Sequence, residues 1–130
     1  MRVYIISTVL VEIVVQRLTS WELIMTPNEY QLQAMSTAVY PVNHGKAYAV
    51  IGLCNEAGEV AGKFKKYLRD GVAYAVIQQQ IQDELGDVLW YVASVATEFD
   101  LSLASIMEGN LQKLADRKTR GVIGGSGDNR

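Results

Sequence analysis

The stretch Glu56-Ala57-Gly58-Glu59-Val60 decides how this chain is read, because it returns later as Glu84-Leu85-Gly86-Asp87-Val88. Both copies follow the pattern Glu-x-Gly-acid-Val. Residues three apart lie on one face of a helix, so the two acids of each copy project together. If the two helices pack side by side, the sequence predicts that four carboxylates meet between them.

Carboxylates held this close repel one another unless a positive charge offsets them. With no second His or Cys nearby, oxygen ligands favour a hard divalent ion, Mg2+ or Mn2+, over zinc. Gly58 and Gly86 cost helix stability, which indicates close approach of two helix backbones or room for a ligand. The alternative is an acidic helix face that meets water.

The composition fits one domain with one core, since 49% of the 130 residues are hydrophobic. A formal charge of −2 disfavours binding to a nucleic acid polymer. The single Cys54 and the single His44 make an internal disulfide or a zinc cluster within one chain unfavourable, and they favour a reducing, cytoplasmic compartment.

Three regions follow from the pattern along the chain. Residues 1–25 are an N-terminal extension of unclear status, whose apolar run over 3–15 reads as a strand, is interrupted by Glu12 and is too short for a membrane anchor. Residues 26–120 form the helical domain. Residues 121–130 form a glycine-rich tail, expected to be flexible or to wrap a phosphate through backbone N–H groups.

The helical domain is predicted to be all-α and four-helix bundle-like. Thr26-Pro27-Asn28-Glu29 is a capping box with proline at the first helical position, and Asp70-Gly71 is a stop signal. Apolar periodicity and these signals predict helices over residues 27–39, 46–68, 74–98 and 102–118.

Helical spacing also predicts which side chains are buried. The expected core positions are Leu32, Met35, Val39, Val50, Leu53, Ala57, Val60, Ala61, Phe64, Leu68, Ile77, Ile81, Leu85, Val88, Leu89, Val92, Ala96, Ile106, Leu111 and Leu114. Trp90 is expected to point towards solvent or a partner chain. His44 is expected to be solvated in its loop, with contact to a substrate as the alternative.

Basic and aromatic residues flank the acidic pairs. Lys63 and Lys66 follow the first pair along the same helix, and Tyr91 lies one turn beyond Asp87. In the last helix Asn110, Lys113 and Arg117 share a face, again either a solvated surface or a phosphate-binding one. Tyr91 fits a contact with a sugar or base, or a core or interface position.

Three segments together resemble the MazG-like nucleoside triphosphate pyrophosphohydrolases, particularly the short phage-type members. They read Gly52-Leu53-Cys54-Asn55-Glu56-Ala57-Gly58-Glu59-Val60, Glu84-Leu85-Gly86-Asp87-Val88-Leu89-Trp90-Tyr91 and Asn110-Leu111-Gln112-Lys113-Leu114-Ala115-Asp116-Arg117. The resemblance runs from Thr26 to the C-terminus. Some relatives have two adjacent glutamates where this chain has Asn55-Glu56, which leaves a fifth carboxylate in question.

The resemblance implies an all-α bundle assembled as a homo-oligomer, a dimer or tetramer, that acts in the cytoplasm of a bacterium or of a phage-infected cell. It implies Mg2+-dependent cleavage of a nucleoside triphosphate, a deoxynucleotide or modified nucleotide, between the α and β phosphates. The implied metal ligands are Glu56, Glu59, Glu84 and Asp87, with Glu59 also the catalytic base. The implied substrate-binding residues are Lys63, Lys66, Tyr91, Asn110, Lys113 and Arg117.

Two other classes compete with this interpretation. Di-iron carboxylate bundles also pair acids on four helices, but they use Glu-x-x-His, and no His stands three residues after any Glu here. A non-catalytic helical interaction or regulatory module is the stronger alternative. The four acids and the basic residues together favour the enzyme.

Overall fold

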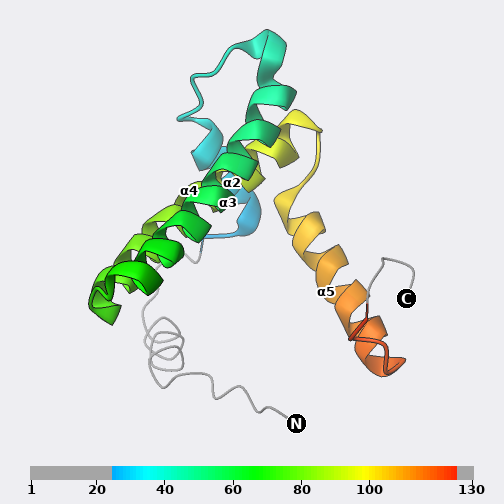
Figure 1. Ribbon diagram of the computed structural model, residues 1–130. Coiled ribbons are helices and arrows are strands. Elements are labelled where there is room, and N and C mark those ends of the chain that lie inside the picture. The colour runs from blue at the N-terminus through cyan, green and yellow to red at the C-terminus, as the bar shows by residue number, and fades with distance from the viewer. Residues whose placement is uncertain (1–24, 126–130) are drawn as a thin grey trace, which may run out of the picture.

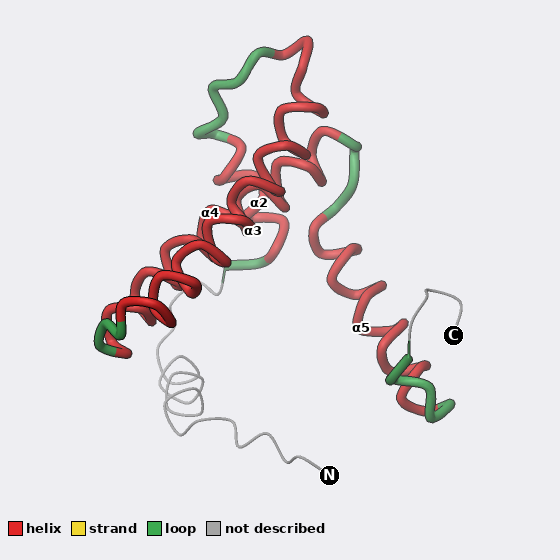
Figure 2. The backbone as a smooth tube through the Cα atoms, viewed as in Figure 1, coloured by secondary structure: helices red, strands yellow, loops and turns green. Residues whose placement is uncertain are grey.

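The structure, a computed structural model, describes residues 25–125. Its elements are α2 (Pro27–Met35), the short 3-10 helix η1 (Val42–His44), α3 (Gly45–Asp70), α4 (Tyr74–Glu98) and α5 (Leu103–Thr119). Within the described range there is no strand, which confirms the all-α prediction (Figure 2). The expectations for the N-terminal extension and for the end of the tail lie outside these residues.

The first helix begins as its capping box predicts. The Glu29 backbone N–H donates to Thr26 Oγ1 at 3.2 Å, and the Thr26 N–H donates to the Glu29 carboxylate at 2.6 Å. The helix ends at Met35, earlier than the predicted residue 39. The Ser36 and Thr37 hydroxyls donate back to carbonyls of the last turn, and such bonds compete with continued helix.

Helices α3 and α4 form a long hairpin that dominates the shape (Figure 1). Gly71 ends α3 in the left-handed region with φ 64°, and its N–H donates to the Tyr67 carbonyl at 3.0 Å. The predicted stop at Asp70-Gly71 is therefore confirmed. The short connection forces the two helices to run antiparallel, so their facing flanks meet along most of their length.

Helix α2 packs across α4 and closes a small core. Its centre is Ala34, Ala93 and Leu103. Trp90 packs against this cluster, and its indole N–H donates to the Ala34 carbonyl at 3.1 Å and to Thr37 Oγ1 at 2.9 Å. The prediction that Trp90 points to solvent or a partner chain was therefore wrong, because α2 and the turn that follows it supply acceptors for its N–H.

Helix α5 packs mainly on α2 and diverges from the α3–α4 hairpin (Figure 1). Its N-cap is Ser102, as predicted, whose hydroxyl accepts from the Ser105 N–H. The Gln31 side chain bridges the junction by accepting from the Leu103 N–H and donating to the Leu101 carbonyl. None of the described helices combines the length and apolarity needed to cross a membrane.

Many predicted core positions are exposed in this arrangement. Ile77 and Ala96 are buried, and Met35, Leu53, Val60, Ile81, Val88 and Val92 are partly buried. The prediction was wrong for Leu32, Val39, Val50, Ala57, Ala61, Phe64, Leu68, Leu85, Leu89, Ile106, Leu111 and Leu114, all of which are exposed. An elongated hairpin gives each helix few neighbours within the described chain, so the apolar stripe of a helix is only partly covered.

Candidate metal centre

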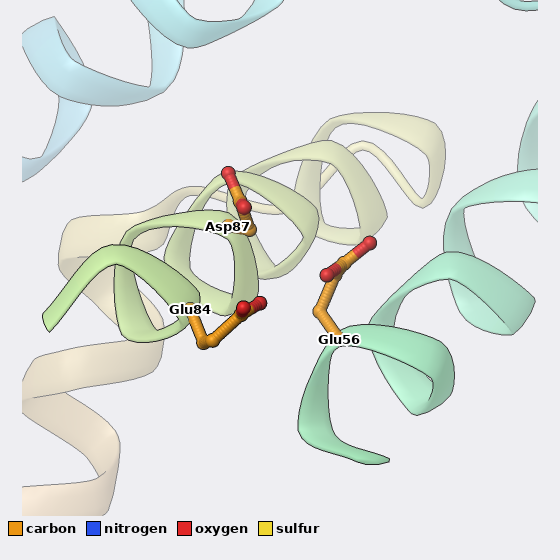
Figure 3. A group of neighbouring side chains, drawn as sticks. All are labelled: Glu56, Glu84 and Asp87. Carbon is orange, nitrogen blue, oxygen red and sulfur yellow. The ribbon is translucent and has the colours of Figure 1, made fainter. Parts of the chain in front are cut away.

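Three of the predicted carboxylates meet across the hairpin. Glu56 comes from α3, and Glu84 and Asp87 come from successive turns of α4. One oxygen from each lies within 4.8 Å of the others. Figure 3 shows Glu56 and Glu84 extending towards each other between the two helices, with Asp87 beside them. Glu56 and Glu84 are partly buried, whereas Asp87 is exposed. The group therefore lies at the edge of the hairpin, open to solvent on one side.

The chemistry of this group fits a hard divalent cation. Mg2+ binds oxygen ligands at about 2.1 Å in octahedral geometry, which puts adjacent ligand oxygens about 3 Å apart and opposite ones about 4 Å apart. One oxygen from each of the three carboxylates lies within 4.8 Å of the others, a spacing close to those values. The three residues can hold Mg2+ or the similar Mn2+.

The two motif glycines leave space beside the acids. A Cβ built at Gly58 or Gly86 meets no atom within 4 Å. Within the described chain they therefore do not mark close contact between helix backbones, and that interpretation was wrong. Room for a ligand stays a prediction.

A lysine lies against the acidic group. Lys63 Nζ is 3.3 Å from Glu84 Oε1, with 30% of the lysine side chain and 14% of the glutamate side chain exposed. Glu59 is exposed and is not among the three grouped carboxylates. Lys66 is exposed further along α3, where its charge helps to lower the pKa of Asp70, after the larger effect of the Arg69 hydrogen bond.

Tyr91 lies within electrostatic reach of the same acids. Burial raises the pKa of its phenol, and a hydrogen bond with Tyr48 and the negative charges of Glu56 and Asp87 raise this pKa further. Its ring packs on Gly52 so closely that a Cβ there would overlap it. Tyr91 thus borders the carboxylate group from the side of the α3 N-terminus.

Sequence reasoning missed Tyr48. Its ring centroid is 6.4 Å from that of Tyr91 and 5.0 Å from that of Tyr40, on which it stacks. Its position was visible in the spacing, because Tyr48, Gly52 and Glu56 follow one another at intervals of four along α3.

Residues 47–122, more than half of the chain, match the MazG nucleotide pyrophosphohydrolase domain. This chain belongs to the MazG family. It is also similar to the Gene 37 protein of Mycobacterium phage L5, with 49% identity over 109 residues that cover 78% of this chain and 96% of that protein. No solved structure gives a significant match.

The remaining candidates of this MazG chain lie away from the carboxylates. Asn110 and Lys113 are exposed on α5, and Arg117 on the same helix is only 5% exposed. Because α5 diverges from the hairpin, the described chain does not bring them to the acidic group (Figure 1). His44 is exposed, as expected. It lies twelve residues before Glu56, which corresponds to about 18 Å along a helix, so it is far from the carboxylates.

Proposed function

We propose that this MazG protein is a Mg2+-dependent nucleoside triphosphate pyrophosphohydrolase. It cleaves between the α and β phosphates and releases a nucleoside monophosphate and pyrophosphate. Membership of the family supports the class of reaction. The observation that carries the metal dependence is the meeting of Glu56, Glu84 and Asp87 within 4.8 Å.

Glu56, Glu84 and Asp87 would hold a Mg2+ ion, and Glu59 would complete the set of ligands from the same flank of α3 as Glu56. A bound Mg2+ supplies charge neutralisation to the phosphate oxygens. Glu59, exposed and outside the group of three, acts as general base. Because its side chain is exposed, a water molecule can reach its carboxylate and pass a proton to it.

The proposed step balances as a hydrolysis. A water oxygen forms a bond to the α phosphorus while the bond from that phosphorus to the α–β bridging oxygen breaks. The water proton passes to Glu59, and the electron pair leaves with pyrophosphate. Lys63 and Lys66, on the flank of α3 beyond the acids, neutralise the triphosphate.

The nucleoside contacts Tyr91, which borders the carboxylates on the opposite side from Lys63. We propose a deoxynucleotide or a modified nucleotide as substrate, drawn from the cytoplasm of a bacterium or of a phage-infected cell. The open side of the acidic group, where Asp87 is exposed, leaves room for a triphosphate chain.

The protein functions as a homo-oligomer, a dimer or tetramer. Large apolar side chains such as Phe64, Leu89 and Leu111 are 45–65% exposed on the hairpin and on α5, and a second copy would cover them. In such an assembly Asn110, Lys113 and Arg117 contact the substrate from a neighbouring α5. Light scattering coupled to gel filtration tests this, and a monomer at micromolar concentration would contradict it.

The function is tested by incubating the purified full chain with Mg2+ and a panel of standard and modified nucleoside triphosphates. We expect pyrophosphate and monophosphate in equal amounts. Glu59→Gln is expected to lower kcat by about 100-fold or more, and Asp87→Asn to abolish turnover. The matched control is Asp83→Asn, since Asp83 is exposed on α4 and bonded only to Gln79 among described residues.

Three results would contradict the proposal. Release of orthophosphate without pyrophosphate would mean a different cleavage site. Wild-type rates in both Glu59→Gln and Asp87→Asn would show that these carboxylates are not the active site. No turnover with any nucleotide would favour a helical interaction module.

A further inference from the structure

One cation already contacts the acidic group. Among residues 25–125, the ion pair to this group comes from Lys63. Its Nζ lies 3.3 Å from Glu84 Oε1, and Glu84 is one of the three clustered carboxylates. Its ammonium offsets one of three negative charges held within 4.8 Å of one another. Glu84 has only 14% of its side chain exposed, so water screens this charge poorly and the lysine stabilises the group.

We infer that Lys63 is an internal counter-ion that holds Glu84 until substrate arrives, weakening Mg2+ binding by the free protein and coupling it to nucleotide binding. This inference rests on the proposed function and deepens it. It assigns to Lys63 a positioning role distinct from simple attraction of phosphate.

The competition follows from the geometry of the pair. A divalent ion held by Glu84 would lie a few ångströms from an ammonium that bonds the same carboxylate, and two positive charges repel strongly at that distance. The site is partly buried, so salt screens this repulsion incompletely. Lys63 must therefore move away, or the ion binds weakly.

A triphosphate gives the ammonium another partner. Lys63 lies two helical turns beyond Glu56 on α3, on the same flank, and a lysine has three donors on a flexible four-carbon stem. Phosphate oxygens bound beside the carboxylates can accept those donors without movement of the helix. Substrate thereby releases Glu84 for the cation.

Thermodynamic linkage then requires reciprocity. If nucleotide removes Lys63 from Glu84 and so tightens Mg2+ binding, Mg2+ tightens nucleotide binding by the same factor. Loss of the lysine charge should abolish this part of the coupling. The prediction therefore concerns binding equilibria and needs no turnover.

The experiment is calorimetric titration of Mg2+ into the full chain, alone and with a deoxynucleoside triphosphate whose α–β bridging oxygen is replaced by carbon. Without nucleotide, we expect Lys63→Met to bind Mg2+ about tenfold tighter than wild type, equivalent to 1.4 kcal/mol. The analogue should tighten Mg2+ binding more in wild type than in Lys63→Met. Lys63→Arg, which keeps the charge, should behave as wild type does.

The matched control is Lys65→Met. Lys65 is exposed on the same helix and forms no ion pair with the three carboxylates in the described chain, so its loss removes the same charge and should change Mg2+ affinity less than about twofold. The ion-free Lys63→Met protein should also melt at a lower temperature than wild type and recover on addition of Mg2+. If Lys63→Met does not fold, Lys63→Gln replaces it in every measurement.

The outcomes separate the two claims. If wild type binds Mg2+ but Lys63→Met binds it equally or more weakly, Lys63 orients Glu84 and the counter-ion inference is wrong. Equal coupling to the analogue in both proteins also overturns it. If wild type takes up no divalent ion with or without the analogue, the proposed function itself fails.

Discussion

Replacing Gly52 with alanine tests whether Tyr91 packs on α3 beside the acidic group. In an open helix interior Gly→Ala stabilises by up to about 1 kcal/mol. At Gly52 the new methyl would overlap the Tyr91 ring, and such overpacking costs about 1–3 kcal/mol. The two effects have opposite signs, so we expect Gly52→Ala to lower the free energy of unfolding by up to about 2 kcal/mol.

The matched control is Gly62→Ala in the same helix, where a Cβ meets nothing within 4 Å. This variant should gain up to about 1 kcal/mol, so the two variants should differ by about 1–3 kcal/mol. Urea unfolding followed by circular dichroism measures both, and the KM for nucleotide should rise only in Gly52→Ala. Equal stabilisation by the two substitutions would refute the packing of Tyr91 on Gly52.

Three further predictions address the rest of the fold. Trp90→Phe removes the donor to Ala34 and Thr37 and should cost about 1–3 kcal/mol in urea unfolding; an unchanged midpoint would contradict the observed packing of α2 on α4. The pKa of Glu29 is lowered from 4.5 by hydrogen bonds from Thr26, so its stabilisation is present above pH 4.5 and lost as pH falls through the lower folded-state pKa. Wild type and Glu29→Gln should therefore converge in melting temperature on acidification, and a gap that widens would reverse the assigned sign. Leu111→Glu should shift the oligomer towards monomer in light scattering, because it places a charge on an exposed apolar face. An unchanged molecular mass would mean that this face of α5 is not part of the interface between copies.

Sequence predicted helix boundaries well wherever a local signal fixed them. The Thr26 capping box, the Gly71 stop and the Ser102 cap all act within a few residues, and each lies where expected. The predicted end of α2 at residue 39 was wrong: the helix ends at Met35, and the Ser36 and Thr37 hydroxyls donate to carbonyls of its last turn. Ser and Thr also occur inside helices, so residue type alone did not indicate this end.

Burial was predicted poorly for a physical reason. Periodicity shows which face of a helix is apolar, but not what covers that face. Leu68 and Leu111 are on apolar stripes yet 69% and 65% exposed. Trp90 was predicted to be exposed but packs against the core. Its burial depends on α2 crossing α4, a contact between residues at least 53 positions apart in the sequence.

Only part of the candidate site could be predicted from the sequence. The sharing of a face by Glu84 and Asp87 follows from helix geometry, and the connection at Gly71 brings Glu56 opposite them. The pairing of Lys63 with Glu84 and the approach of Tyr48 to Tyr91 depend on how far α3 slides along α4. That offset is set by tertiary packing, which a single sequence does not specify.

The central claim is that carboxylates from α3 and α4 form one Mg2+ site. Its most direct test is calorimetric titration of Mg2+ at neutral pH into wild type and Asp87→Asn, each alone and with the carbon-bridged nucleotide analogue. We predict saturable uptake by wild type, stronger with the analogue, and its loss or marked weakening in Asp87→Asn. Absence of uptake by wild type in both conditions, or equal uptake by the two proteins, would contradict the account.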